Sequence, residues 1–425
     1  MLDIKLLRKD PQTIEKLIKS KDPTVDLPKI LEMDEEIRQL KFEVEALKLK
    51  RNQSAKEIGE KKRAGTKVSD LLKEVDGLKE TISDTDTKLF EKERLLNEAL
   101  AYLPNLPMKD VPHSIDPKNN VCLKSHLQKP TFTFAPKNHL ELGEAHSLFD
   151  FKRGVKVGGA GWPAYKGLGA RLEWALINFM IDTHINNGFE LWIPPLLARK
   201  EIMFGSAHLP KFEEQLYKLH DKDHELYLIP TSESVLNGLH FNEILSEDSL
   251  PLKYVSYTPC FRREAGAAGS SERGLIRTHQ FNKIEMFCIT RPENSEKMFH
   301  EMVEAAEEIL KALDLHYKRM LLVTGDISFA AAKTIDLEVF LPGQDRYYEV
   351  SSISTCTDFQ ARRSKLRFKK GQEKPDFPHT LNGSGLATSR LMVALLENNQ
   401  QEDGSIKIPP PLQKYLGGLS KIISN

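Results

Sequence analysis

The 425-residue sequence is poor in cysteine, with only Cys122, Cys260, Cys288 and Cys356, and no two of them form a CxxC pair. This spacing argues against a disulfide framework or a structural zinc site. No apolar run approaches the roughly 18 residues that a membrane-spanning helix needs. The first ten residues also lack the apolar core of a secretory signal. We therefore expect a cytoplasmic protein without a membrane partner.

An excess of one charge and the common nucleotide-binding loops are also absent. The 61 basic and 61 acidic residues cancel, so the overall charge does not indicate a polyanionic partner, and any such partner must meet a local patch. The sequence has no GxxxxGK[ST] loop and no dinucleotide-binding glycine fingerprint. A nucleotide would therefore be held in another way. The length is sufficient for two or three domains with a large core.

Two heptad repeats fill much of the first hundred residues. The first begins after Pro28 and continues to Ile58, with seam positions Ile30, Met33, Ile37, Leu40, Val44, Leu47, Arg51, Ser54 and Ile58. The second has seam positions Leu71, Val75, Leu78, Ile82, Thr85, Leu89, Lys92, Leu96 and Ala99. Such seams are typical of helices that pair as coiled coils. Residues 59–68 show no helical pattern and are the expected turn, so we predict an antiparallel helical hairpin with arms about 50 Å long at ~1.5 Å per residue.

Charge is distributed unevenly along this hairpin. Residues 48–67 contain eight bases and two acids, whereas residues 68–100 contain nine acids and five bases. A solvated helix face explains many charge runs of this kind. The other interpretation is an arm that lays a basic tip on nucleic-acid phosphates. The candidate tip residues are Lys50, Arg51, Lys61, Lys62 and Arg63.

The prolines of residues 104–119 mark a linker, so we predict an arm domain over residues 1–103 and a second domain over residues 120–425. In the second domain we expect helices over 166–188 and 294–313 and a last helix starting near Gly385. The expected strands lie near 189–193, 225–230, 253–263, 275–289, 318–323, 335–341 and 346–353. They come largely in hairpins, which predicts an α+β fold with an antiparallel sheet flanked by helices.

The stretch from Ser256 to Phe287 is the strongest candidate for a ligand platform. Its second segment is predicted to be a strand from Leu275, in which alternate residues share a face. One face carries Ile276, Ile284 and Met286, and the other carries Arg277, His279, Phe281, Lys283 and Glu285. An antiparallel sheet with one solvated face would explain the alternation without a ligand.

Four further stretches accompany this hairpin. Residues 188–195 read as a turn, a strand and a Pro-Pro stop, and residues 230–233 form a Pro-Thr-Ser-Glu strand end. Residues 348–352 offer a carboxylate and hydroxyls, which are hard oxygen ligands suited to Mg²⁺. Residues 382–390 form a small-residue strand end that opens onto a helix carrying Arg390. Each stretch alone is a weak signal, and their order together is the informative feature.

Taken in order, these stretches resemble the class II aminoacyl-tRNA synthetases, specifically the bacterial-type seryl-tRNA synthetases, over almost the full length. Residues 188–195 match the first class II motif, residues 261–264 with 277–281 match the second, and residues 383–390 match the third. Thr388-Ser389 departs from the family, in which a bulkier apolar residue and a glycine are more usual. The loop from Gly266 to Gly274 varies across the family, so its contacts are not carried over.

The resemblance implies a two-step reaction. Serine and ATP would form seryl-adenylate and pyrophosphate, and the seryl group would pass to the 3′ end of tRNA(Ser) and, by family analogy, of tRNA(Sec). The resemblance also implies a homodimer and a requirement for Mg²⁺. The basic hairpin would bind the tRNA.

The resemblance also assigns residues to this chemistry. The expected catalytic residues are Arg262, Glu349 and Arg390, of which Arg262 can fork onto the α-phosphate and the serine carboxylate. The expected ATP-binding residues are Arg262, Arg263, Glu264, Phe281, Glu349, Val350, Ser351, Ser352 and Arg390. Phe281 and Arg390 would sandwich the adenine, and Glu349 and Ser352 would carry Mg²⁺. The expected serine-binding residues are Thr231, Ser232, Glu233, Arg262, Glu285, Asn382 and Ser384. Lys283 receives no role, and His279 is expected to be structural.

Two alternatives remain beside this interpretation. A class II paralogue could activate an amino acid without charging tRNA, although such paralogues tend to lack a tRNA-binding arm. A coiled-coil nucleic-acid or scaffold protein without catalysis would use the hairpin alone, and Arg262, Glu264 and Glu349 would then be surface ion-pairing residues. ATP–pyrophosphate exchange with each amino acid separates all three.

Overall fold

The computed structural model describes residues 1–264 and 274–423. The chain divides into two compact units, Met1–Pro104 and Asn105–Asn425. The predicted loop from Gly266 lies, up to residue 273, outside the described residues. Residues 105–119, predicted as a linker, include Asn105, whose Nδ2 donates hydrogen bonds to Ala330 O at 2.9 Å and Cys356 O at 2.8 Å in the second unit. The three-part division at residues 103 and 119 stays a prediction.

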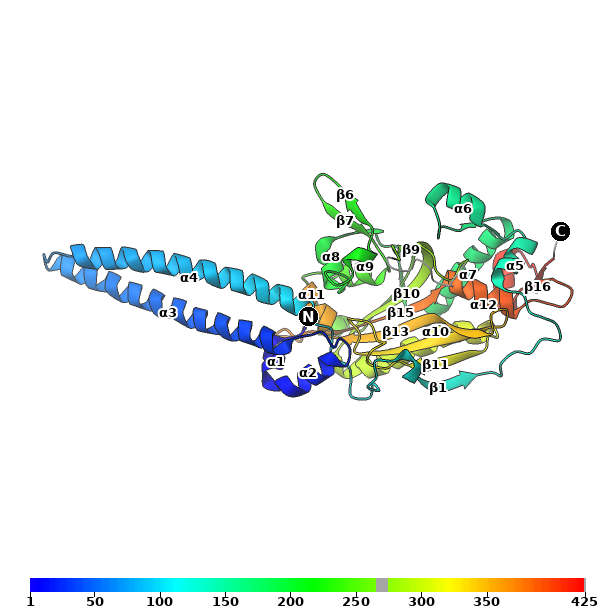
Figure 1. The fold of residues 1–425 in the computed structure, drawn as a ribbon, viewed down its shortest axis with the longest axis horizontal. Coiled ribbons are helices and arrows are strands. Elements are labelled where there is room, and N and C mark those ends of the chain that lie inside the picture. Colours follow the sequence, from blue (N-terminus) through cyan, green and yellow to red (C-terminus); the bar gives the residue numbers. More distant parts are fainter. Residues whose placement is uncertain (265–273, 424–425) are drawn as a thin grey trace. The chain divides into compact units, whose positions relative to one another are not determined.

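The first unit is helical (Figure 1). It consists of α1 (Ile4–Lys9), α2 (Pro11–Lys19), α3 (Leu27–Arg63) and α4 (Ser69–Ala101). Aspartate side chains cap the first three helices, because Asp3, Asp10 and Asp26 each accept a backbone N–H of the first turn. The cross-helix ion pairs Lys41–Glu93 at 2.7 Å and Lys50–Glu74 at 2.9 Å show that α3 and α4 pair in an antiparallel manner.

The buried side chains of the two long helices confirm the predicted coiled-coil seam. On α3 they include Ile30, Ile37, Val44, Ser54 and Ile58, and on α4 they include Val75, Leu78, Ile82, Thr85 and Leu96. The predicted turn over residues 59–68 is too long, because α3 continues to Arg63. Lys61, Lys62 and Arg63 are good helix formers whose charges favour a helix C-terminus, and Lys61 pairs with Glu57 one turn earlier at 2.7 Å. The sequence did not show helical periodicity over these last residues of α3, because exposed charged residues carry no apolar pattern.

The second unit is built on a mixed sheet with antiparallel pairing throughout except at one edge. In the part of the chain that the structure describes, eight strands follow the order β1-β11-β12-β13-β15-β10-β9-β4. Among the described strands of this sheet, β4 and β9 form the one parallel pair. The strands are β1 (Val121–His126), β11 (Tyr317–Leu321), β12 (Lys333–Leu341), β13 (Arg346–Thr357), β15 (His379–Ala387), β10 (Gln280–Thr290), β9 (Leu252–Phe261) and β4 (Glu190–Trp192). This arrangement confirms the predicted α+β class.

Three helices pack on this sheet through apolar side chains. They are α7 (Gly167–Asn186), α10 (Ser295–Ala312) and α12 (Thr388–Asn398). Leu176 of α7, Phe299 of α10 and Leu391 of α12 are fully buried in one hydrophobic core with the sheet residues Ile284 and Leu337. None of the described helices is both long enough and apolar enough to span a membrane.

Smaller elements surround the main sheet. The helices are α5 (His139–Ala145), α6 (Phe151–Gly158), α8 (Lys200–Gly205), α9 (Glu233–Gly238), α11 (Phe359–Ser364) and α13 (Pro410–Gln413). The minor sheets pair β2 (Phe149–Asp150) with β3 (Ala164–Tyr165), β8 (Ile244–Ser246) with β14 (Arg367–Lys369), β16 (Ile406–Lys407) with β17 (Lys421–Ile422), and β5 (Leu197–Arg199) and β6 (Lys218–His220) with β7 (Glu225–Leu228).

Two predicted boundaries beside the platform were wrong. The second strand of the hairpin begins at Gln280, not Leu275, because the β9–β10 ladder starts at the Gln280–Phe261 pair and Glu264 adopts a left-handed φ of 48° just beyond it. The last long helix begins at Thr388, not near Gly385. β15 continues to Ala387 because its backbone pairs with β10 up to the Lys283–Ala387 position.

Candidate active site

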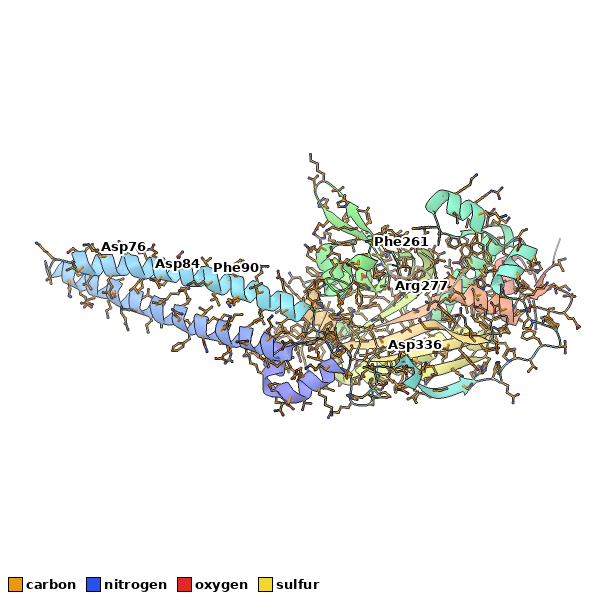
Figure 2. The ribbon with its side chains drawn as sticks, viewed as in Figure 1. Asp76, Asp84, Phe90, Phe261, Arg277 and Asp336 are labelled. Carbon is orange, nitrogen blue, oxygen red and sulfur yellow. The ribbon has the colours of Figure 1, made fainter. Side chains whose placement is uncertain are left out.

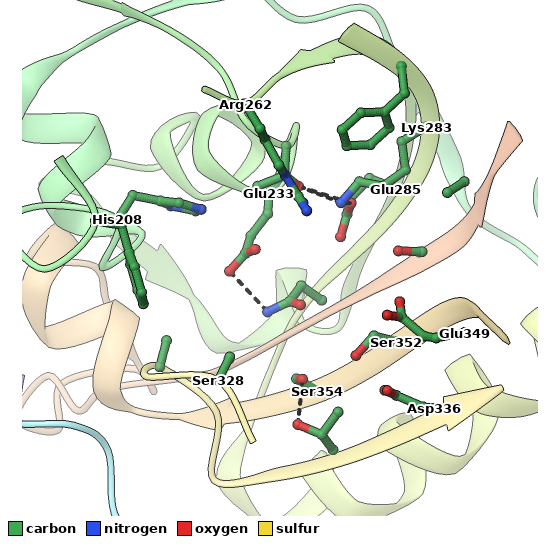
Figure 3. Close-up of a pocket in the computed structure, with 18 of the residues that line it drawn as sticks. His208, Glu233, Arg262, Lys283, Glu285, Ser328, Asp336, Glu349, Ser352 and Ser354 are labelled. Atoms are coloured by element: carbon green, nitrogen blue, oxygen red, sulfur yellow. Dashed lines mark hydrogen bonds and ion pairs between the residues drawn. The ribbon is translucent and has the colours of Figure 1, made fainter. Parts of the chain in front are cut away.

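A cavity of about 420 Å³ opens among β10, β12, β13, β15, α9 and α12 (Figure 3). Most of the predicted site residues line it, although they lie up to 159 positions apart in the chain, from Thr231 to Arg390. The lining includes Thr231, Glu233, Arg262, Glu264, Phe281, Glu285, Glu349, Ser352, Asn382, Ser384 and Arg390. The fold thus gathers the second and third sequence motifs and the 230–233 stretch around one space.

Arg262 lies just beyond the end of β9 and points into this space between Glu233 and Glu285 (Figure 3). Its Nε donates a hydrogen bond to Pro230 O at 3.3 Å, and its guanidinium lies 5.1 Å from the centre of the Phe281 ring. These contacts hold the planar side chain on an aromatic face. Such a fork is suited to a carboxylate or a phosphate.

At one side of the cavity, three polar side chains form a buried cluster. Glu285 is 1% exposed and Lys283 is 6% exposed, and the two form an ion pair. The Thr231 hydroxyl donates to Glu285 Oε2 at 3.0 Å and accepts from Lys283 Nζ at 2.8 Å. Lys283, which received no role from the sequence, therefore compensates the buried charge of Glu285. The Lys283 ammonium already contacts Thr231 and Glu285, two of the predicted serine-binding residues. The cluster therefore offers oxygen acceptors of the kind that an amine requires.

Glu233 begins α9 beside this cluster. Its Oε1 accepts hydrogen bonds from Gln360 Nε2 at 2.6 Å and from Asn382 Nδ2 at 3.1 Å. Burial and the nearby charge of Glu285 raise the pKa of Glu233 to about 7. A cationic ligand would favour the ionised form of this carboxyl group.

At the other side, Arg390 and Glu349 form a second polar cluster. Arg390 Nη1 donates to Glu349 Oε2 at 2.9 Å and to Glu349 O at 3.1 Å. The Arg390 guanidinium lies 4.9 Å from the centre of the Tyr348 ring. The cation is thereby oriented by one aromatic face and one carboxylate.

Asp336 lies next to this second cluster and was missed by the sequence analysis. It pairs directly with Ser352 across β12 and β13, and Figure 3 shows it beside Glu349 and Ser352. Burial and the charge of Glu349 raise its pKa well above the usual range, and its Oδ1 has no hydrogen-bond partner among the described residues. Pairing of the two expected strands, 335–341 and 346–353, places Asp336 opposite Ser352, and this pairing was the signal that could have indicated it.

These oxygens fit a divalent cation. Two carboxylates and a hydroxyl, one of the carboxylate oxygens unpartnered, match the hard-oxygen preference of Mg²⁺. The described residues contain no cluster of three or more His, Cys, Asp or Glu side chains that could hold a metal alone.

His208 is a second residue that the sequence analysis missed, and no motif could have indicated it. Its Nδ1 lies 2.9 Å from Ser206 Oγ and 3.3 Å from Ser234 Oγ, and the side chain lines the cavity. Burial and the positive charges of Arg262 and Lys283 lower its pKa to about 3. The imidazole is therefore neutral near pH 7.

Several predicted residues do not line the cavity with their side chains. Arg263 is exposed, Val350 is buried in the core, Ser351 Oγ donates to Ser384 O at 2.5 Å, and Ser232 Oγ accepts from Ser256 Oγ at 2.7 Å.

His279, expected on the platform face, instead packs on Trp162 with ring centres 5.6 Å apart, and its backbone N–H donates to Gly161 O at 3.0 Å. Ile276, expected on the opposite face, lines the cavity with Arg277. The turn before β10 breaks the alternation that the prediction assumed.

The predicted tRNA-binding residues all lie on α3 of the first unit. Lys50 pairs with Glu74 at 2.9 Å and Lys61 with Glu57 at 2.7 Å. Arg51 donates to Asn52 Oδ1 at 3.1 Å, and Lys62 and Arg63 are exposed. The returning helix α4 carries acids, among them Asp76 and Asp84 (Figure 2).

Both parts of the chain match known protein families. Residues 1–107 match the family described as the seryl-tRNA synthetase N-terminal domain. Residues 217–399 match the tRNA synthetase class II core domain (G, H, P, S and T). The serine–tRNA ligase of Chlamydia felis is 52% identical over 417 residues, which cover 98% of each chain.

Solved structures agree with the sequence comparisons. The crystal structure of seryl-tRNA synthetase from Pyrococcus horikoshii complexed with ATP is similar over 100% of both chains, with a TM-score of 0.95 and 36% identity. The crystal structure of cytoplasmic serine–tRNA ligase from Naegleria fowleri in complex with AMP has a TM-score of 0.90 at 28% identity, covering 100% of this chain and 99% of that one.

Proposed function

This chain belongs to the seryl-tRNA synthetase family of class II aminoacyl-tRNA synthetases, and we infer that it is a serine–tRNA ligase that uses ATP. One observation carries the chemical assignment. Arg262 stands in a single cavity between the buried Thr231–Lys283–Glu285 cluster and the Arg390–Glu349 cluster. The first cluster suits an amine, and the second suits the nucleotide. The Arg262 guanidinium between them can donate to both a carboxylate and a phosphate.

In the first step, a serine carboxylate oxygen attacks the α-phosphorus of ATP. The bond from that phosphorus to the oxygen bridging to the β-phosphate breaks, and pyrophosphate leaves with the electron pair. Arg262 can contact both reacting groups and neutralise the charge that builds between them. The step needs no general base, because the attacking carboxylate is already ionised. In the second step, the 3′-terminal adenosine hydroxyl of tRNA attacks the seryl carbonyl carbon and loses its proton. The bond from that carbon to the phosphate oxygen breaks, and AMP leaves with the electron pair.

We assign serine recognition to the buried end of the cavity. Glu285, Glu233 and Thr231 offer acceptors for the ammonium and the hydroxyl, and Asn382 and Ser384 complete the lining. A site that hydrogen-bonds a substrate hydroxyl rejects an analogue without it by ~10⁴–10⁵-fold. Alanine would be excluded in this way, and threonine by lack of space.

We assign adenine to the space between Phe281 and Arg390, with Glu264 near its amino group. Glu264 Oε2 accepts from Arg277 Nε at 2.6 Å, which orients its carboxylate at the edge of the cavity. Arg263, Val350 and Ser351 would then contribute through their backbone atoms. Glu349 and Ser352, with Asp336, would hold Mg²⁺, which supplies charge neutralisation at the ATP phosphates.

We further propose that the bases on α3 bind tRNA(Ser) through its phosphates. Lys50, Arg51, Lys61, Lys62 and Arg63 lie on the surface of α3 without a matching excess of acids on that helix segment. Charging of tRNA(Sec) is part of this proposal by family analogy only. A homodimer through the first motif is also proposed, because Ile193 next to β4 is 85% exposed and Leu191 is 40% exposed.

The experiment is ATP–pyrophosphate exchange with each amino acid in turn, followed by aminoacylation of tRNA(Ser). Serine alone should support exchange, and the tRNA should then be charged. Exchange without charging would favour the class II paralogue, which activates an amino acid for another acceptor. No exchange with any amino acid would overturn the assignment.

A further inference from the structure

Thr388 stands where the family more usually has a bulkier apolar residue, and its environment is polar. It is the first residue of α12, two positions before Arg390, and its side chain is fully buried. A buried hydroxyl without a partner costs free energy, so the surroundings of this threonine must supply an acceptor.

The acceptor is a buried carboxylate on a different helix. Thr388 Oγ1 donates to Glu173 Oε1 of α7 and lies 3.0 Å from Asn282 O of β10. The same Glu173 Oε1 accepts from Asn282 Nδ2 at 2.9 Å. Glu173 is 5% exposed, and the Tyr257 hydroxyl donates to Asn282 Oδ1 at 3.3 Å. The group formed by Glu173, Asn282 and Thr388, named here the Glu173 triad, therefore ties α7, β10 and α12 together.

The Glu173 triad lies directly behind two walls of the cavity. Asn282 is the residue between Phe281 and Lys283, and Thr388 precedes Arg390 by two positions. Phe281 and Arg390 line the cavity, whereas no member of the triad does. Hydrogen bonds are directional, so one carboxylate that accepts from the side chains of both Asn282 and Thr388 fixes the separation of β10 and α12 more narrowly than apolar packing does.

We propose that Glu173 is a positioning residue that, through Asn282 and Thr388, sets the distance between Phe281 and Arg390 and so determines the affinity for the adenine of ATP. This inference rests on the proposed function, in which these two side chains enclose the adenine. Glu173 Oε2 has no hydrogen-bond partner among the described residues, although the side chain is buried. A structural requirement alone would be met at lower cost by apolar side chains of the same volume.

The primary test is Thr388→Val, which removes the hydroxyl at almost constant volume. In serine-dependent ATP–pyrophosphate exchange, KM for ATP should rise about five- to tenfold. KM for serine should stay within about twofold, because the Thr388 hydroxyl bonds to Glu173 and Asn282, whereas the serine cluster is held by the bonds among Thr231, Lys283 and Glu285. Glu173→Leu should give the same change. Glu173→Gln keeps an oxygen that can accept both bonds, so it should restore KM for ATP to within about twofold of the wild type.

The double variant Glu173→Leu with Thr388→Val should be no worse than either single variant, because both changes remove the same interaction. Thr183→Val is the matched control, since Thr183 of α7 is also a buried threonine, but its hydroxyl donates to Phe179 O, at 2.8 Å, within its own helix. It should leave KM for ATP unchanged. Melting temperatures are recorded for all variants.

The inference fails if Thr388→Val lowers the melting temperature but leaves KM for ATP within about twofold, or if KM for ATP and for serine rise together. Direct ATP binding by calorimetry separates this failure from that of the proposed function. A wild-type chain that binds ATP without serine-dependent exchange contradicts the function. A normal wild type with an unaltered Thr388→Val variant contradicts only the positioning role.

Discussion

Glu285 is the residue whose removal should affect serine recognition most. It is almost fully buried, pairs with Lys283 and accepts from the Thr231 hydroxyl. Glu285→Ala should lower kcat/KM for serine in ATP–pyrophosphate exchange at least about 1,000-fold. The ion pair with Lys283 and the hydrogen bond from Thr231 are both lost, and the Lys283 ammonium is left with its hydrogen bond to the Thr231 hydroxyl.

A matched control for this change is Glu307→Ala. Glu307 is equally buried but pairs with Arg319 at 2.7 Å and does not line the cavity. It should reduce stability and leave KM for serine near the wild-type value. Near-normal exchange in Glu285→Ala would show that the serine site has been assigned to the wrong residues.

The raised pKa of Glu233 predicts a pH dependence of serine use. The carboxyl group has a pKa of about 7 in the unliganded protein, and a bound ammonium favours its ionised form. A proton must therefore leave Glu233 when serine binds, and this release becomes more costly as the pH falls. We expect kcat/KM for serine to be level above pH 7 and to fall by about tenfold per pH unit below it.

Steady-state exchange between pH 5.5 and 8.5 measures this profile. Glu233→Gln lacks the titrating group, so its activity should be lower but its slope below pH 7 should disappear. If the glutamine variant retains the wild-type slope, another group is responsible for the pH dependence.

Among the residues of the cavity, the sequence predicted those that belong to contiguous motifs and missed those that only the fold brings in. Arg262 directly follows β9, Phe281 and Arg390 lie near the starts of β10 and α12, and Glu349 lies within β13. The motifs that contain them follow one another in a recognisable order. His208, in contrast, stands in a short segment after α8 whose position depends on packing against α9 and α11. Lys283 was visible on the platform face, but its partners Thr231 and Glu285 are set by tertiary contacts that a single strand pattern does not contain.

At the scale of elements, one helix of the first unit is held by a buried aspartate. Asp34 of α3 is almost fully buried and accepts from Arg8 of α1 through Nε at 2.6 Å and Nη2 at 2.5 Å, and from Arg38 Nε at 3.3 Å. Asp34→Ala should lower the free energy of opening the α1–α3 contact by about 1.5–3 kcal/mol, towards the lower value because Arg8 is partly exposed.

Native-state hydrogen exchange of the α1 and α3 amides in the full chain measures this free energy. Glu35→Ala is the control, since Glu35 is exposed and accepts from Arg38 and Gln39, two exposed residues of its own helix. It should change the value by less than about 0.5 kcal/mol. Equal effects of the two variants would mean that the Arg8–Asp34 pair does not fasten α1 to α3.

Element prediction succeeded where periodicity was continuous. The α3 and α4 seams were found because apolar residues recur at three and four positions, even through Arg51 and Ser54. The errors in the prediction concerned the ends of helices and strands. The sequence near Gly385 is rich in small residues, which fit a strand end and a helix start equally well. Pairing with β10, up to the Lys283–Ala387 position, keeps β15 extended there. Such pairing is a property of the sheet, not of the segment.

For the whole molecule, the proposed function requires that RNA charging and amino-acid activation depend on different parts of the chain. The cavity lies within the second unit, whereas the basic residues 48–67 lie within the first. A change of charge on α3 should therefore alter charging and leave activation intact. Lys61→Ala, Lys62→Ala and Arg63→Ala, combined in one variant, remove three cations from this segment.

The combined variant should raise KM for tRNA(Ser) in aminoacylation by about ten- to a hundredfold at 0.1 M salt, because each lost phosphate contact weakens binding and reduces its salt dependence. A control variant replaces Lys29, Lys79 and Lys88, three exposed cations of α3 and α4 outside the basic segment, with alanine. Serine-dependent ATP–pyrophosphate exchange should be normal in both variants. Equal losses of charging in the two would indicate a general charge effect, whereas a selective loss with a shallower salt slope requires that phosphates contact the basic segment itself.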